Sequence, residues 1–189
     1  MTYPVGATKY KRPNFSKEGD TAYCPLPSRE QETDWPTIVL ESGLSEMHTR
    51  LRHDAQWWIV NCGGDVNIVI IISIKPAQKT LLVEKWGPFG YRPAHPNPNA
   101  PIPTKMQELT IAQNPTPQLG TTLHSNTIAQ PIVTVQPGTV SAYDIVGAPL
   151  ILEFDKIFLR TAVPPNESDI VFSAADLALW ADYFWKGVK

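Results

Sequence analysis

Residues 36–86 decide the fold and read PTIVLESGLSEMHTRLRHDAQWWIVNCGGDVNIVIIISIKPAQKTLLVEKW. The β-branched run 37–41 follows a proline and ends shortly before Gly43, which is typical of a buried central strand. The run 66–74 is nearly all β-branched and predicts a second buried strand. After a turn, residues 80–86 predict a partner strand for it. The stretch therefore predicts a sheet built around two buried strands.

Between the two buried strands the spacing changes to that of a helix. Ser45 is placed to cap its N-terminus, and Glu46 stands in the first turn, where a carboxylate suits the helix dipole. Gly63-Gly64 predicts the end of the helix. Apolar residues recur at intervals of three and four and predict one buried face, made of Met47, Leu51, Ala55, Trp58 and Ile59.

The flanking regions predict one domain over 1–189, with the ordered core at 17–86. A short strand is expected at 21–24. Nine of the 19 prolines fall between Pro93 and Pro137, so we expect an extended, proline-rich segment over 87–137 that either wraps the domain or stays mobile.

The C-terminal part, 138–189, is expected to pack on the core. Residues 140–145 predict a strand, and 150–159 predict a strand that runs into a short helix. Ser173 is expected to cap a final amphipathic helix.

Composition limits the functional classes. The net charge is −2, so it does not support a strong, sequence-independent hold on nucleic acid. The most apolar run has nine residues, about half of what a membrane helix needs, so no membrane association is expected. Only Cys24 and Cys62 are present, which excludes a disulfide framework. We expect an intracellular protein of the cytoplasm or nucleus.

Two segments carry a resemblance to a known family. Lys17-Glu18-Gly19-Asp20-Thr21-Ala22, followed by Pro36-Thr37-Ile38-Val39-Leu40-Glu41-Ser42-Gly43, resembles the PD-(D/E)XK (restriction-endonuclease-like) nuclease superfamily. Residues 34–58 also resemble a set of fungal proteins with a D-W-P-T…E-x-G…R-L-R-x-D-A-x-W-W core. The resemblance covers about 17–86 and, more weakly, 147–185. It implies an α/β fold with a restriction-endonuclease-like mixed sheet and flanking helices.

The resemblance also implies a site. In that superfamily an Asp at the start of one strand and an acidic residue on the next bind a divalent metal, and a Lys two positions on helps to position the attacking water. Asp20 and Glu41 match the two acidic positions, so they are the expected ligands of Mg²⁺. Mg²⁺ prefers carboxylate oxygens and can activate water for phosphodiester cleavage.

The chain departs from the superfamily pattern at two positions. Gly43 stands where the motif has its Lys, and Gly19 stands where it has a Pro. A basic residue on the following helix can replace the Lys in this superfamily, so Arg52 is the expected electrostatic partner, with Arg50 in reserve. Arginine is always protonated, so either residue would stabilise charge and would not act as a base.

Structural interpretations stand beside these functional ones. Asp20 follows a glycine, as turn residues do, and Glu41 can simply pair with Arg50 or Arg52 on the packed helix. His48 and His53 are five positions apart and point to different sides of a helix, so no histidine metal site is expected. Each is expected to be a surface histidine, with a base near Glu41 as the alternative. Trp57, on the other side of the helix from Trp58, is free to cover a sheet edge, a ligand or a partner.

Three functional classes remain. The first is a metal-dependent nuclease acting on DNA or RNA phosphodiesters. The second is a catalytically degenerate relative that binds a partner, which the missing Lys would explain. The third is the same scaffold with a small-molecule ligand in an aromatic pocket, which the six tryptophans would suit. The strand 80–86, if its edge is exposed, also allows a homodimer.

Overall fold

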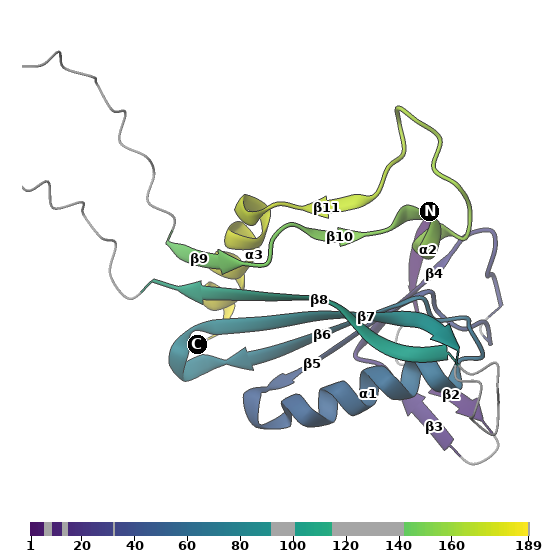
Figure 1. Cartoon of the computed structure of the whole chain (residues 1–189), viewed down its shortest axis with the longest axis horizontal. Coiled ribbons are helices and arrows are strands. Elements are labelled where there is room, and N and C mark those ends of the chain that lie inside the picture. Colours follow the sequence, from purple (N-terminus) through teal and green to yellow (C-terminus); the bar gives the residue numbers. More distant parts are fainter. Residues whose placement is uncertain (6–8, 13–14, 32, 92–100, 115–141, 189) are drawn as a thin grey trace, which may run out of the picture.

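The computed structural model describes residues 1–5, 9–12, 15–31, 33–91, 101–114 and 142–188 (Figure 1). These residues form a mixed α/β structure around a seven-stranded sheet with the strand order β1-β4-β5-β6-β7-β8-β9. The strands are β1 (Thr2–Val5), β4 (Thr21–Pro25), β5 (Ile38–Leu44), β6 (Ile68–Lys75), β7 (Thr80–Tyr91), β8 (Pro101–Gln113) and β9 (Tyr143–Val146). The α/β class and the expected buried strands are confirmed.

The centre of the sheet is a parallel strand–helix–strand unit. β5 and β6 run parallel and are joined by α1 (His48–Asn61), and the other neighbouring pairs of the seven described strands run antiparallel. β5 and β6 are apolar because both of their faces are covered. α1 ends as predicted, since Gly63 and Gly64 adopt φ values of +74° and +101°, which favour glycine.

The start of α1 differs from the prediction. A 3₁₀ turn, η1 (Ser45–Met47), precedes the helix, and neither it nor α1 has a side-chain cap. Ser45 is therefore not the N-cap of the α-helix, which begins three residues later at His48. The predicted buried face is correct at Leu51, Ala55, Trp58 and Ile59. It is wrong at Met47, which belongs to η1 and is exposed.

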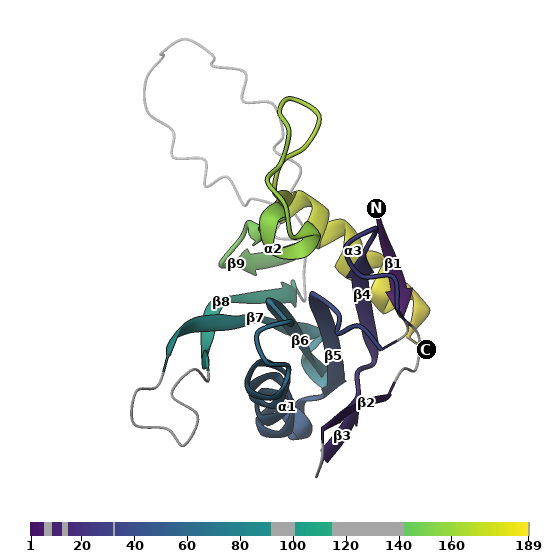
Figure 2. The same ribbon diagram turned by 90° about the vertical axis from the view of Figure 1, so that its right-hand side faces the viewer.

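The C-terminal elements cover the other face of the sheet (Figures 1 and 2). They are β10 (Leu150–Leu152), α2 (Phe154–Phe158), β11 (Ile170–Phe172) and α3 (Ala174–Gly187), and β10 pairs with β11 in a separate two-stranded sheet. The predicted cap of α3 is confirmed, because Ser173 and Asp176 form a reciprocal capping box. Two apolar cores result, one under α1 and one under the C-terminal layer.

An N-terminal hairpin lies beside α1. It consists of β2 (Lys9–Arg12) and β3 (Phe15–Glu18), and its register pairs Tyr10 directly with Lys17. Tyr10 is buried against Trp35 and Trp58, with ring centroids 5.1 and 5.6 Å away. Directly paired residues share one face of a hairpin. Burial of Tyr10 therefore brings Lys17 to the face of the sheet that α1 covers.

Two expectations need correction. The stretch 87–137 contains the 13-residue strand β8, and the parts of the expected proline-rich segment at 92–100 and 115–141 lie outside the described residues. The strand at 80–86 does not have a free edge, because β7 pairs with β6 on one side and β8 on the other. That strand therefore offers no open edge at which a homodimer could pair. No helix in the described part of the chain is long and apolar enough to cross a membrane.

Candidate functional site

A row of carboxylates crosses the sheet beneath α1. In the strand register Glu41 on β5 is level with Ile71 on β6, which is level with Glu84 on β7, and Glu84 is level with Glu108 on β8. Glu41 is 5% exposed and Glu84 is fully buried. Since a buried carboxylate requires hydrogen bonds or opposite charges, each is expected to have its own partners. Two separate polar clusters, either side of Ile71, provide them.

The first cluster surrounds Glu41. Trp58 Nε1 donates a hydrogen bond to Glu41 Oε1 over 2.6 Å, and Lys17 Nζ lies 3.5 Å from the same oxygen. Lys17 Nζ also lies 2.6 Å from Asp54 Oδ1 on α1. One ammonium group therefore bridges two carboxylates that come from the sheet and the helix.

Asp20 lies at the exposed end of this cluster. It immediately precedes β4, and its Oδ2 accepts hydrogen bonds from Ser42 N (2.8 Å) and Ser42 Oγ (2.9 Å). Ser42 follows Glu41 on the neighbouring strand. The structure thus has Asp20 directly before β4, beside the strand that carries Glu41, and the two hydrogen bonds from Ser42 fix the orientation of Asp20.

The charge around Glu41 is unbalanced. Burial raises the pKa of Glu41, and the negative charges of Asp20 and Asp54 raise it further. The hydrogen bond from Trp58 and the charge of Lys17 act in the opposite direction without cancelling the rise in pKa. A buried carboxylate with a raised pKa among other carboxylates is common at functional sites.

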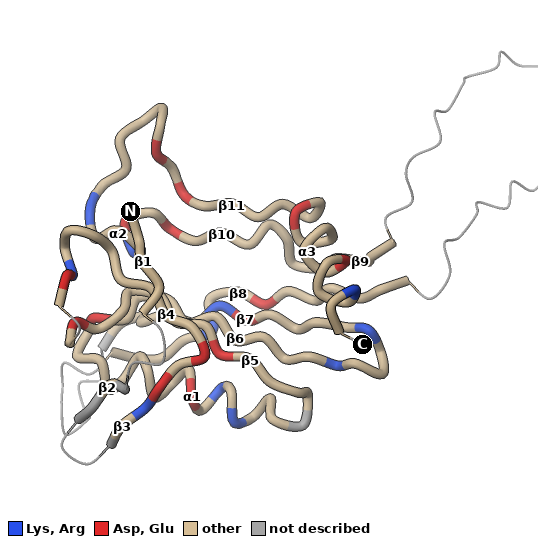
Figure 3. Tube along the Cα trace, turned by 180° about the vertical axis from the view of Figure 1, so that it is seen from behind, with Lys and Arg blue, Asp and Glu red and all other residues tan. Residues whose placement is uncertain are grey.

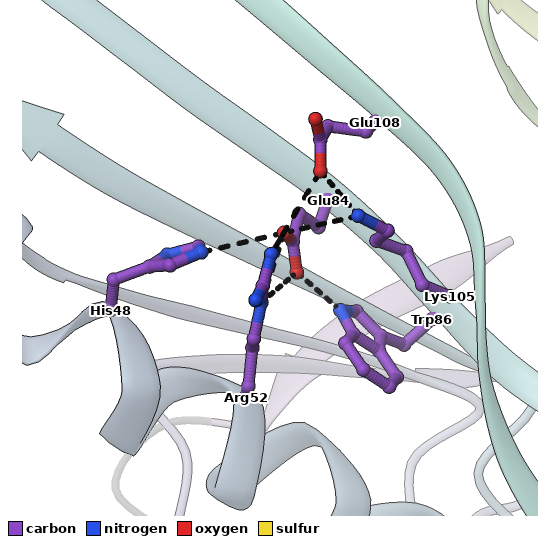
Figure 4. Close-up of polar contacts among 6 residues, drawn as sticks. All are labelled: His48, Arg52, Glu84, Trp86, Lys105 and Glu108. Carbon is purple, nitrogen blue, oxygen red and sulfur yellow. Dashed lines mark hydrogen bonds and ion pairs between the residues drawn. The ribbon is translucent and has the colours of Figure 1, made fainter.

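The second cluster surrounds Glu84 (Figure 4). Arg52 Nε donates to both Glu84 oxygens over 3.1 Å, its Nη2 lies 2.5 Å from Oε1, and Trp86 Nε1 donates to Oε2 over 2.8 Å. Lys105 Nζ and His48 Nε2 lie 3.7 and 3.4 Å from Oε1. Both ring nitrogens of His48 are buried and make no hydrogen bond within the described structure. His48 is therefore part of this cluster and not the surface residue that we expected.

The Glu84 cluster is electrostatically satisfied. Burial by itself would raise the pKa of Glu84, but the hydrogen bonds from Arg52 and Trp86 and the charges of Arg52 and Lys105 hold it below the ordinary value. The ionised form of Glu84 is thus favoured in the folded chain. This arrangement is typical of a structural ion pair that joins α1 to the sheet.

The structure separates the residues that the sequence hypothesis had grouped. Asp20 and Glu41 come together, whereas Arg52 binds Glu84, and Arg50 is exposed with its Nε 4.0 Å from Asp54. The basic residue beside Glu41 is Lys17, which the sequence reasoning missed. Its only signal was its place in the segment Lys17–Ala22, because no local pattern predicts how a distant hairpin docks.

Gly43 occupies the position at which the superfamily motif has its lysine. A Cβ atom at Gly43 would contact Leu51 and Met47 at 3.7 Å. These are ordinary van der Waals distances, so a Cβ atom fits at this position. The positive charge beside Glu41 comes instead from Lys17 on β3.

The carboxylates suit a magnesium ion with few protein ligands. Mg²⁺ is commonly held by one or two carboxylates with waters and substrate phosphates completing its shell. Asp20 and Glu41 can supply two such groups. No set of three His, Cys, Asp or Glu side chains within the described ranges is arranged to hold a metal. The residues fit a weak, hydrated site and do not form an all-protein cage.

Comparison with known proteins adds no further constraint. The chain matches no protein-family model, no curated protein and no solved structure. The functional argument therefore depends on the geometry of the two clusters.

Proposed function

We propose that this chain is a nuclease-like, metal-dependent hydrolase of nucleic-acid phosphodiesters, built on a restriction-endonuclease-like core of β4, β5, α1 and β6. The observation that carries the proposal is the Glu41 cluster. There, Lys17 pairs with a buried carboxylate whose pKa is raised, Asp54 binds the same ammonium, and Asp20 binds the neighbouring Ser42. Neighbouring strands lie about 4.8 Å apart, a spacing at which two carboxylates can share one cation.

Each residue of the cluster has a defined part in this proposal. Asp20 and Glu41 would hold Mg²⁺, which when bound polarises a phosphate and lowers the pKa of its water. Ser42 orients Asp20, and Trp58 orients Glu41. Lys17 supplies a positive charge for the anionic phosphate, and Asp54 holds Lys17 in place. Arg50 is exposed near Asp54 and free to approach a substrate phosphate, whereas Arg52 is engaged by Glu84.

A second candidate function is a catalytically inactive binding module on the same core. It is favoured by the burial of Glu41, of which only 5% is exposed, and by the ammonium of Lys17, which already neutralises part of the acidic cluster. The small-molecule alternative receives less support. The rings of Tyr10, Trp35, Trp57 and Trp58 pack against one another at 5.1–6.3 Å, as core side chains do.

Metal titration separates the two candidates. Mg²⁺ and Mn²⁺ binding would be measured by calorimetry on the wild type, Asp20→Asn and Glu41→Gln, with nicking of supercoiled plasmid assayed in parallel. Asp144→Asn, at an exposed carboxylate on β9, is the matched control. The hydrolase proposal expects metal binding and metal-dependent nicking in the wild type and control, and the loss of both in the two site variants.

The opposite result is equally clear. A folded wild type that binds neither metal at millimolar concentration and nicks no plasmid would exclude the hydrolase and leave the binding module. Metal binding that survives in both site variants would place the metal elsewhere and overturn the assignment of Asp20 and Glu41.

A further inference from the structure

The β2–β3 hairpin carries Lys17 but lies outside the main sheet, beside α1 (Figure 3). Among the described residues its two strands pair only with each other. An isolated two-stranded hairpin is marginally stable in water. Side-chain packing must therefore hold the hairpin where Lys17 Nζ lies 2.6 Å from Asp54 Oδ1 and 3.5 Å from Glu41 Oε1.

Tyr10 anchors the hairpin. It is 4% exposed, and its ring centroid lies 5.1 Å from that of Trp35 and 5.6 Å from that of Trp58. Its hydroxyl is buried and makes no hydrogen bond with any described residue. The attachment is therefore made by the aromatic ring and not by the hydroxyl group. Because Tyr10 is directly opposite Lys17 in the hairpin, the anchor lies beside the residue that enters the Glu41 cluster.

Trp58 joins this anchor to the Glu41 cluster. It is fully buried, and the Tyr10 ring meets it edge-on with an interplanar angle of 73°. Its Nε1 donates to Glu41 Oε1 over 2.6 Å, and Lys17 Nζ faces the same oxygen. The hairpin therefore packs on one indole through Tyr10 and reaches the carboxylate bound to that indole through Lys17.

The chain that leaves the hairpin also passes close to Trp58. A Cβ atom at Gly19 would lie 3.0 Å from Val39 Cγ1 and 3.3 Å from Trp58 Cζ2, which is closer than ordinary van der Waals contact. Any residue with a side chain would have to displace one of these neighbours, so glycine allows the close approach. Lys17 and Asp20 lie on either side of this point in the chain. Docking of the hairpin on Trp58 therefore places both of them.

We propose that Tyr10 is the positioning residue of the Glu41 cluster: its ring docks the β2–β3 hairpin on Trp58 and so holds Lys17 in place. The ammonium of Lys17 then bridges Glu41 and Asp54. An undocked hairpin would leave these two carboxylates without their shared cation. The placement of Lys17 is a property of the fold, whereas its use on a substrate phosphate rests on the proposed function.

Acetylation of lysine amines in the full chain, followed by mass spectrometry, tests the placement of Lys17. Its side chain is 17% exposed and ion-paired, so it should react slowly in the wild type. Tyr10→Ser should undock the hairpin and raise the rate at Lys17 at least ~10-fold, because local opening exposes a residue without global unfolding. Tyr10→Phe keeps the ring that makes the attachment and should keep Lys17 protected.

Two lysines and a second tyrosine provide the controls. The side chain of Lys85 is 5% exposed and should stay protected in every variant, whereas that of Lys186 is 68% exposed and should react rapidly in every variant. Tyr183→Ser, at an exposed tyrosine of α3, should leave Lys17 protected.

Three results would overturn the positioning role. The first is protection of Lys17 that survives in Tyr10→Ser, and the second is its loss in Tyr10→Phe. The third is an equal loss of protection at Lys17 and Lys85 in Tyr10→Ser, which would assign Tyr10 to the stability of the whole fold.

Plasmid nicking separates this inference from the proposed function. For a metal-dependent nuclease, Tyr10→Ser should nick as poorly as Lys17→Met, and Tyr10→Phe should restore nicking. Undiminished nicking by Tyr10→Ser with Lys17 exposed would retain the hydrolase and overturn the role of Tyr10 in its site. A wild type that nicks no plasmid, with Lys17 acetylated as expected, would overturn the hydrolase and retain the placement of Lys17 by Tyr10.

Discussion

Glu41 and Glu84 occupy the same row of the sheet, but their surroundings differ in charge. Each accepts a hydrogen bond from an indole N–H, but Glu41 has two other carboxylates and one lysine near it, whereas Glu84 has an arginine and a lysine. The folded chain therefore disfavours the ionised form of Glu41 and favours that of Glu84. Functional sites are often maintained at a cost in stability. The buried carboxylate of Glu41, whose ionised form the fold disfavours, is a group of this kind.

Neutral substitutions at the two positions should have opposite consequences for stability. Glu41→Gln removes a charge that the fold disfavours, and its amide oxygen can still accept from Trp58, so the free energy of unfolding at pH 7 should fall by less than ~1 kcal/mol or rise. Glu84→Gln breaks a buried ion pair and should cost about 3 kcal/mol. Urea unfolding of both variants measures the difference. Equal losses would show that Glu41 is as structural as Glu84.

The two indoles that donate to these carboxylates provide site-specific reporters of pH. The pKa of Glu41 is raised, so the indole N–H resonance of Trp58 should titrate above pH 4.5, the ordinary value for Glu. The pKa of Glu84 is lowered, so the Trp86 resonance should titrate below that pH. Proton–nitrogen NMR spectra across this range measure both. Titration of both indoles at the same pH would contradict the assigned environments.

Stability should follow the same signs. Glu84 contributes stability that is fully present above the unfolded-state pKa and is lost as the pH falls through its lowered folded-state pKa. For Glu41 the unfolded chain releases its proton first, so stability falls as the pH rises from the unfolded-state value to the raised folded-state value. Glu41→Gln should remove this second dependence and leave the first unchanged.

At the scale of elements, a small number of buried polar contacts hold the C-terminal layer to the sheet. Lys85 on β7 is 4% exposed, and its Nζ donates to Ile151 O (2.6 Å) and to Glu153 (2.7 Å). Thr37 Oγ1 donates to Ile157 O (2.8 Å). These donors would otherwise be buried without partners. The hydrogen bonds therefore fix the position of the C-terminal layer on the sheet, in addition to apolar packing.

Removing the Lys85 ammonium should loosen this layer. Lys85→Met removes the buried partner of Glu153 and should lower the free energy of unfolding by about 3 kcal/mol. Amide hydrogen exchange in β10 and α2 should become faster. Lys156→Met removes the more exposed partner of the same carboxylate and should change stability by less than ~0.5 kcal/mol. Urea unfolding and hydrogen exchange measure both variants. Similar effects of the two would show that burial of Lys85 is unimportant.

The cap of α3 is a second test at this scale. Ser173→Ala removes the side-chain acceptor for Asp176 N and should lower the free energy of unfolding by about 1 kcal/mol. Ser168→Ala, at an exposed serine before β11, should have little effect. Thermal unfolding measures both, and an unchanged midpoint for Ser173→Ala would show that α3 is held by packing alone.

At the scale of the whole molecule, the two faces of the sheet have different properties. The α1 face carries the row of carboxylates, and the opposite face carries the C-terminal layer (Figures 1 and 2). The proposed hydrolase site and the C-terminal layer therefore lie on opposite sides of the sheet.

The sequence determined the elements whose signals are local. Periodicity and glycines predicted β5, the buried face and end of α1, β6 and the cap of α3, because these features depend on residues a few positions apart. It did not predict β8, because prolines at 101 and 103 obscured a strand that is stabilised by pairing with β7. Ser45 was misread as the N-cap because a 3₁₀ turn, Ser45–Met47, precedes the α-helix.

The candidate site shows the same division between local and tertiary information. The family resemblance placed Asp20 and Glu41 on neighbouring strands, and the structure has Asp20 immediately before β4 and Glu41 on β5, which pairs with β4. Tertiary structure alone assigned Lys17 to Glu41 and Arg52 to Glu84, because both assignments depend on how a hairpin and a helix dock on the sheet. Those contacts join residues 24 and 32 positions apart, and no local pattern in the chain determines their geometry.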